Sequence, residues 1–292
     1  MDTVSSIICK AFLDNCPAEK RRALLEILPK EEKQKIEALP QTFQNPLFGG
    51  LTSKQQLDRI HYSWFASYLR TFTENEIQLF ITVLNENQAR GVRKALLLSD
   101  NQLELTSVSK TFLEKTLLEK TAQDKPDLLP IACLPESPLN VLLSLQLPEF
   151  IRLFDFLGIH DLAYEIKQII ETAKLKKIYS VLSPEELSFL KTLLHQKETL
   201  AFKPIGIQQS DGDVERLKSI LHQRGINRLA KALYQEDPSL VWYISHQLDV
   251  ERAAILLKLS TDLQNLRAVH LLIQQVVDCL TYLQTKKSES SL

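Results

Sequence analysis

The stretch that decides the fold runs from Arg216 to Leu259 and reads RLKSILHQRGINRLAKALYQEDPSLVWYISHQLDVERAAILLKL. Its apolar residues recur every three or four positions, which places them on one face of a helix. Gly225 stands where a helix commonly ends in a left-handed residue, so we expect it to be a C-cap, with Asn227 capping a second helix. An Asp-Pro pair at 237–238 predicts the start of a third helix, and Asp249 the cap of a fourth. We therefore expect four short helices here.

An earlier stretch repeats this pattern 67 residues upstream. From 150 and from 217, both copies read apolar-x-x-apolar-apolar, then three residues, then Gly-Ile-x-x-Leu-Ala-x-x-apolar, with Gly158 in the place of Gly225. Further on, Ser183 with Glu186 predicts a capping box at the position of Asp249, with a slip of one residue. Repeats of paired helices are typical of armadillo-like solenoids. We expect an all-α fold of armadillo-like units with a period of about 67 residues, stacked into an elongated array.

The amino-acid composition agrees with a helical fold, and it disfavours nucleic acid and anionic membranes as partners. The 292 residues include only seven glycines, and the 35 basic and 36 acidic residues are mixed along the chain. This balance leaves no net field to attract nucleic acid or an anionic membrane. The four cysteines, at 9, 16, 133 and 279, lack metal-ligand spacing, so we expect free thiols in a reducing compartment and no metal site.

The sequence contains no strong catalytic or cofactor-binding motif. The six histidines are scattered along the sequence, and no glycine-rich loop precedes a predicted helix. No serine, cysteine or aspartate has a neighbouring base at a spacing typical of a catalytic pair. His246 is the most tempting catalytic candidate, although a hydrogen-bonded structural imidazole is the simpler interpretation. We therefore expect no catalytic residue and no cofactor, so that the protein is not an enzyme.

Proline-rich and polar segments suggest four parts. These are an N-terminal helical docking segment at 1–50, with helices meeting at Pro29 and a linker from Pro40 to Gly50; a helical domain at 51–123; an armadillo-like unit at 124–200; and a second unit with a long C-terminal helix at 201–292. In the helical domain, Thr73 with Glu76 predicts a capping box. The aromatic residues between 61 and 72 fit either a core or a partner groove.

No apolar run approaches the roughly 20 residues that span a bilayer. The N-terminus has an aspartate at position 2 and no basic leader. We expect a cytoplasmic protein without membrane insertion, either free or peripheral at the cytoplasmic face of the inner membrane through a protein partner. In isolation it should be a monomer or a weak dimer.

The central stretch resembles the C-terminal region of FliG, the flagellar motor switch protein, over about Leu217 to Leu283. The resemblance rests on Leu-x2-Ile-Leu-x7-Leu-Ala-x-Ala-Leu, on three spaced apolar residues at 240, 244 and 248, and on Arg252-Ala253-Ala254. FliG-type proteins are chains of armadillo-like units that form a ring under the export apparatus. The resemblance therefore implies a scaffold for a flagellar-type or virulence type III secretion apparatus, with a FliF-like membrane-ring protein and other cytosolic ring components as partners.

Several charges of the family are missing. Tyr234 replaces a lysine, and Leu259 with Ser260 replaces an acidic pair that follows the family's arginine, here Arg252. The E-H-P-Q motif used in docking FliM is also absent. We expect a scaffold without stator-dependent torque. The partner-binding candidates are Leu24, Leu25, Leu28, Ile36 and Arg252.

A protein of another class fits the same features. A helical-repeat adaptor for an unrelated protein or peptide would need an exposed apolar or acidic groove rather than stacking faces.

Overall fold

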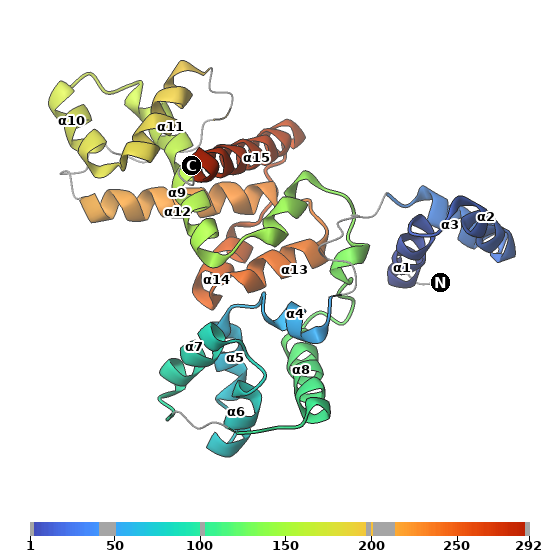
Figure 1. Cartoon of the computed structure of the whole chain (residues 1–292). Helices are drawn as coiled ribbons and strands as arrows, with labels where there is room; N and C mark the ends of the chain where they lie inside the picture. Colours follow the sequence, from blue (N-terminus) through green and yellow to red (C-terminus); the bar gives the residue numbers. More distant parts are fainter. Residues whose placement is uncertain (1–2, 41–50, 100–102, 197–199, 201–213, 290–292) are drawn as a thin grey trace. The chain divides into compact units, whose positions relative to one another are not determined.

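The computed structural model describes residues 3–40, 51–99, 103–196, 200 and 214–289. These residues form fifteen α-helices and two short 3-10 helices, without a strand (Figure 1). The all-α prediction is confirmed. The linker predicted at 40–50 lies, apart from its first residue, outside the described residues.

The chain packs as two units, and neither is continuous in sequence. Unit 1 is residues 1–143 with 237–250, and unit 2 is residues 144–236 with 251–292. The helix at 238–247 therefore packs with unit 1, although the helices on either side of it in sequence belong to unit 2. Sequence neighbours in the deciding stretch do not share one core.

Unit 1 holds the N-terminal helices and the helical region after them. Its elements are α1 (Thr3–Asp14), α2 (Ala18–Ile27), α3 (Lys30–Ala38), α4 (Ser53–Leu57), α5 (Tyr62–Leu69), α6 (Glu74–Ile81), α7 (Glu86–Leu96), α8 (Ser107–Thr121), η1 (Ile131–Cys133), η2 (Pro138–Ser144), which ends at the boundary, and α13 (Pro238–Gln247). As predicted, α2 and α3 meet at Pro29, and Asp237 caps α13 by accepting from the Ser239 N–H at 2.7 Å.

The aromatic residues between 61 and 72 belong to the core of unit 1. Phe65 is fully buried, while Trp64, Tyr68 and Phe72 are partly buried against the same cluster. The core interpretation is therefore correct, and the partner-groove alternative is wrong for these residues. Thr73 and Glu76 form the predicted capping box at the start of α6.

Unit 2 is built on two long helices and the helices around them. Its elements are α9 (Leu147–Ile166), α10 (Thr172–Val181), α11 (Pro184–His195), α12 (Val214–Ala232), α14 (Val250–Leu259) and α15 (Leu266–Glu289). The side chain of Ser183 accepts from the Glu186 N–H at 3.2 Å, and Glu186 accepts from the Ser183 N–H at 2.7 Å. This confirms the predicted capping box. Asp249 directly precedes α14, as an N-cap would.

The predicted glycine caps are wrong. Gly158 lies inside α9 and Gly225 inside α12, neither has a positive φ, and Asn227 is likewise internal to α12. Three helices, α12 to α14, therefore replace the four expected. The glycines serve a different purpose, because α9 and α12 cross closely there. A Cβ on Gly158 would overlap the Leu221 carbonyl, and one on Gly225 would overlap the Phe154 carbonyl.

Within the described part of the chain, no helix is both long and apolar enough to cross a membrane.

Candidate functional site

The predicted N-terminal contact residues are only partly available. Leu24, Leu25 and Leu28 are partly exposed. Ile36 is 1% exposed. Because α3, which carries Ile36, packs against α1, this side chain serves the core, and its assignment as a partner contact is wrong.

Exposed apolar residues that the sequence analysis missed lie nearby. Ile8 and Phe12 on α1 are 42% and 61% exposed, and Ile27 on α2 is 79% exposed. Ile8 and Phe12 are four residues apart, so they share a face, opposite the buried Ser6, Lys10 and Leu13. The signal that the sequence offered is the spacing of Ile8 and Phe12, which places two large apolar side chains on one face of α1.

Arg252, the fifth predicted partner residue, is partly buried in unit 2. Its Nε donates to Nε2 of His222 on α12, at 3.2 Å. On the other side of the ring, Nδ1 of His222 lies 2.8 Å from Oδ1 of Asp155 on α9. Three helices thus contribute one side chain each to a row, the Asp155–His222–Arg252 chain. The ring also meets Phe154 edge to face, with centroids 5.4 Å apart.

A second polar cluster lies between the long helices of unit 2, with Arg228 fully buried and Gln275 partly exposed. Arg228 has no exposed surface, and it donates to Asp161 Oδ1 at 2.5 Å and to Gln275 Oε1 on α15 at 2.6 Å. Nearby, His160 Nε2 lies 3.6 Å from Cys279 Sγ. Burial, with Arg228 close by, lowers the pKa of His160 to about 3, and burial raises the pKa of Cys279. A neutral imidazole and an un-ionised thiol in this setting are core groups, since thiolates are the reactive form.

The pairs in both clusters join residues 67 positions apart, namely Asp155 with His222 and Asp161 with Arg228. At matching places in the two sequence copies, the first copy has an aspartate where the second has a histidine or an arginine, and this signal was available before the structure. The apolar positions, on which the predicted repeat rests, do not reveal it.

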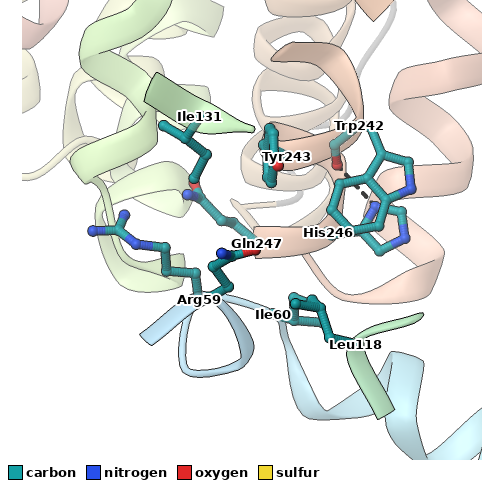
Figure 2. Close-up of a pocket in the computed structure, with 9 residues that line it drawn as sticks. Arg59, Ile60, Leu118, Ile131, Trp242, Tyr243, His246 and Gln247 are labelled. Atoms are coloured by element: carbon teal, nitrogen blue, oxygen red, sulfur yellow. Dashed lines mark hydrogen bonds between the residues drawn. The ribbon is translucent and has the colours of Figure 1, made fainter. Parts of the chain in front are cut away.

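His246, the catalytic candidate, is a structural residue in the core of unit 1. Its ring is stacked between Trp64 and Trp242, with centroids 4.0 and 3.8 Å away, and Figure 2 shows it against Trp242. Nδ1 lies 2.8 Å from the Trp242 carbonyl oxygen. Burial lowers the pKa of His246 to about 4, outweighing the opposing effects of that bond and of Asp124. The imidazole is neutral near pH 7 and enclosed by rings.

The cavity in Figure 2 is too small for a substrate. It has about 10 Å³ of space for the centre of a water molecule. Beside it, Gln247 Nε2 and Arg59 Nη1 both donate to the Leu143 carbonyl, at 3.0 and 2.7 Å. Such a space holds at most about one water. These groups hold α13 against the helices of unit 1.

A larger hollow lies in unit 2. It has about 190 Å³, with Leu145, Leu280 and Leu283 inside and charged residues at the rim. The rim charges are paired, Lys287 with Glu149 at 3.1 Å and Arg152 with Glu185 at 2.8 Å. Ligand pockets usually measure roughly 300–1,000 Å³. The hollow suits a single apolar side chain better than a cofactor.

Among the described residues, no group of three histidine, cysteine or acidic side chains is placed to hold a metal ion. The chain matches no known family model, and neither curated proteins nor solved structures yield a match.

Proposed function

We propose that this chain is a non-enzymatic scaffold resembling FliG, which links membrane-ring and cytosolic parts of a flagellar-type or virulence type III secretion apparatus. It acts at the cytoplasmic face of the inner membrane through a protein partner. The all-helical fold supports this proposal, as do polar clusters that join helices.

The armadillo-like repeat is part of the proposal. In chain order, α9, α10 and α11 have 20, 10 and 12 residues, and α12, α13 and α14 have 19, 10 and 10. Two side-chain pairs between the long helices, Asp155 with His222 and Asp161 with Arg228, also join residues at an offset of 67. Matching helix lengths and matched contacts favour duplication of a three-helix unit, although the glycines are crossing points and not caps.

The observation that carries the proposal is the exposed apolar surface of the N-terminal helices. Ile8 and Phe12 share an exposed face of α1, and Ile27 is exposed at the end of α2. Exposed apolar patches are typical of protein interfaces. In this proposal they are the contact for a membrane-ring protein, together with Leu24, Leu25 and Leu28. Ile36 is no longer part of that contact.

The test is recovery of ring proteins from the native cell with tagged full-length variants. The double variant Ile8→Ser/Phe12→Ser should lose the membrane-ring protein while keeping the helical circular dichroism of the wild type. The matched control is Val108→Ser/Phe112→Ser, which changes an equally spaced, exposed pair on α8 (78% and 68% exposed). The control should recover the ring proteins as the wild type does.

The α8 pair also favours the second candidate, a helical-repeat adaptor for an unrelated protein, because Val108 and Phe112 are an exposed apolar patch of their own. If the α8 variant loses its partner and the α1 variant keeps it, the adaptor is the better account. Wild-type protein that recovers no ring component contradicts the scaffold.

A further inference from the structure

The turn between α9 and α10 carries an apolar side chain that lies almost entirely in water. Ile170 is 95% exposed, more than any other large apolar side chain among the described residues. The turn has a defined backbone, because the Ile169 N–H donates to the Ile166 carbonyl at 3.1 Å and the Ile169 side chain belongs to the buried core. A partner that binds Ile170 therefore has little backbone to order.

Lysines surround this turn in the sequence. Between 167 and 177 the chain has four lysines and one glutamate, a net charge of +3. The glutamate, Glu171, lies 3.1 Å from Lys174. Lys176 and Lys177 are exposed on α10, and neither side chain has an ion pair among the described residues. We call residues 167–177 the basic tip, and Figure 1 shows α10 at the edge of unit 2.

Acidic groups on the neighbouring elements do not cancel this charge. Those in the first turn of α11 lie at the far end of α10, and one of them, Glu185, is paired with Arg152 at 2.8 Å. A ten-residue helix is about 15 Å long, whereas charges are screened over about 8 Å at physiological ionic strength. On α12, which contacts α10, the exposed Glu215 is accompanied by the exposed Arg216 and Lys218.

We propose that the basic tip is a contact site for anionic lipid, in which Ile170 enters the interfacial layer of a bilayer and the lysines bind headgroup phosphates. The net charge of the whole chain, −1, does not oppose this contact, because distant charges are screened. A purely acidic partner would pair with the lysines and leave Ile170 in water. An anionic bilayer accommodates both, as it does for basic segments with apolar side chains.

This contact goes beyond the proposed function, in which the chain reaches the membrane through a protein partner. For one molecule it is weak. A lysine near an anionic surface strengthens binding about fivefold, and the partial burial of one isoleucine about tenfold. In an assembly of many copies the contacts act together, so that weak single contacts give firm attachment. Only this last consequence rests on the proposed function.

Titration of lipid into the isolated full-length protein tests the contact without any partner. Vesicles of phosphatidylcholine and phosphatidylglycerol in equal parts are compared with vesicles of phosphatidylcholine alone, and bound protein is measured by flotation. The wild type should bind only the anionic vesicles. Ile170→Ser should lower the partition coefficient about tenfold, and Lys176→Gln/Lys177→Gln about 25-fold. Both variants change exposed side chains, so their helical circular dichroism should match that of the wild type.

The matched controls lie on α8. Lys115→Gln/Lys120→Gln removes two exposed lysines and gives the same net charge as the lysine variant of the basic tip, and Val108→Ser removes an apolar side chain that is 78% exposed. Both controls should bind as the wild type does.

The contact is refuted if the wild type ignores anionic vesicles, binds neutral ones equally well, or loses as much affinity in the α8 lysine control. Anionic binding that Ile170→Ser leaves unchanged is purely electrostatic, as an acidic protein would give, and it also refutes the entry of Ile170 into lipid. Recovery of ring proteins plays no part in this experiment, so the proposed function can fail while the lipid contact stands.

Discussion

At the scale of single residues, the main finding is that polar side chains are placed inside this protein to join helices. Arg228, with no exposed surface, meets Asp161 and Gln275. His246 is stacked between two tryptophans. Buried charges and imidazoles are tolerated only where partners or neutrality compensate for lost hydration. Each such residue is therefore sensitive to loss of its partner or to acid.

Replacing Asp161 by alanine should strongly destabilise the protein, because it removes a carboxylate that accepts a hydrogen bond from the fully buried guanidinium of Arg228. The loss in unfolding free energy should be about 3–5 kcal/mol, measured by urea unfolding. Glu86→Ala removes an exposed ion pair with Arg90 and should leave the midpoint nearly unchanged. Similar midpoints for both variants would contradict the role assigned to Asp161.

Acid should weaken the fold through the two buried histidines. The folded-state pKa values of His246 and His160 are lowered to about 4 and about 3, so both are neutral when folded and gain protons first in the unfolded chain. The contribution of the two neutral histidines to the free energy of unfolding is complete above about pH 6.5, and it is lost as the pH falls toward their folded-state pKa values of about 4 and about 3. At pH 5 each should have lost about 2 kcal/mol relative to pH 7.5.

The variant His246→Phe keeps a ring between Trp64 and Trp242 but cannot titrate, so it should remove about half of this histidine-linked loss. These are the only two tryptophans of the chain, so their fluorescence reports unfolding at this site. A variant whose stability falls with acid as steeply as that of the wild type would show that His246 does not titrate on unfolding.

At the scale of elements, the crossing of α9 and α12 depends on two glycines in mid-helix. Each is where the other helix's backbone comes closest. Glycine in a helix interior usually lowers stability relative to alanine by roughly 0.5–1 kcal/mol. Here the absence of a side chain offsets that loss, because it permits the close approach of α9 and α12.

Whether a glycine-to-alanine substitution raises or lowers the stability of the protein tests this role of the glycines. Gly225→Ala should destabilise by about 3 kcal/mol or more, because the new methyl group overlaps the backbone of Phe154, which has little freedom to move. Gly91→Ala in α7 is the comparison, since its methyl group overlaps the Tyr62 ring from Cγ onward, so that a side chain rather than a backbone has to move. Greater stability of Gly225→Ala, measured by thermal unfolding, would show that the helices do not cross so closely.

At the scale of the whole molecule, the arrangement separates neighbours in sequence. The helix α13 packs with unit 1, whereas α12 and α14 belong to unit 2. The chain therefore passes between the units three times, near residues 143, 236 and 250. A truncation inside the deciding stretch would remove parts of both cores.

The missing charges lead to a test in cells. In the FliG-like scaffold that we propose, Leu259 and Ser260 stand where the family has an acidic pair, and Tyr234 stands where it has a lysine. We expect the protein, expressed and folded in a cell that lacks its own FliG, not to restore swimming. The endogenous FliG expressed from the same vector is the control. Swimming in the complemented strain would contradict the interpretation of these replacements.

The sequence by itself determined the helical class, the capping boxes at Ser183 and Thr73, and the start of α13 at Asp237, because these depend on residues within one turn of each other. Only the tertiary structure decided the role of Gly158 and Gly225, the burial of Ile36 and the partners of His222 and His246. A Gly-Ile pair fits a helix end and a helix crossing equally well. What selects between them is the backbone of another helix that is far away in the sequence, and no local pattern carries that information.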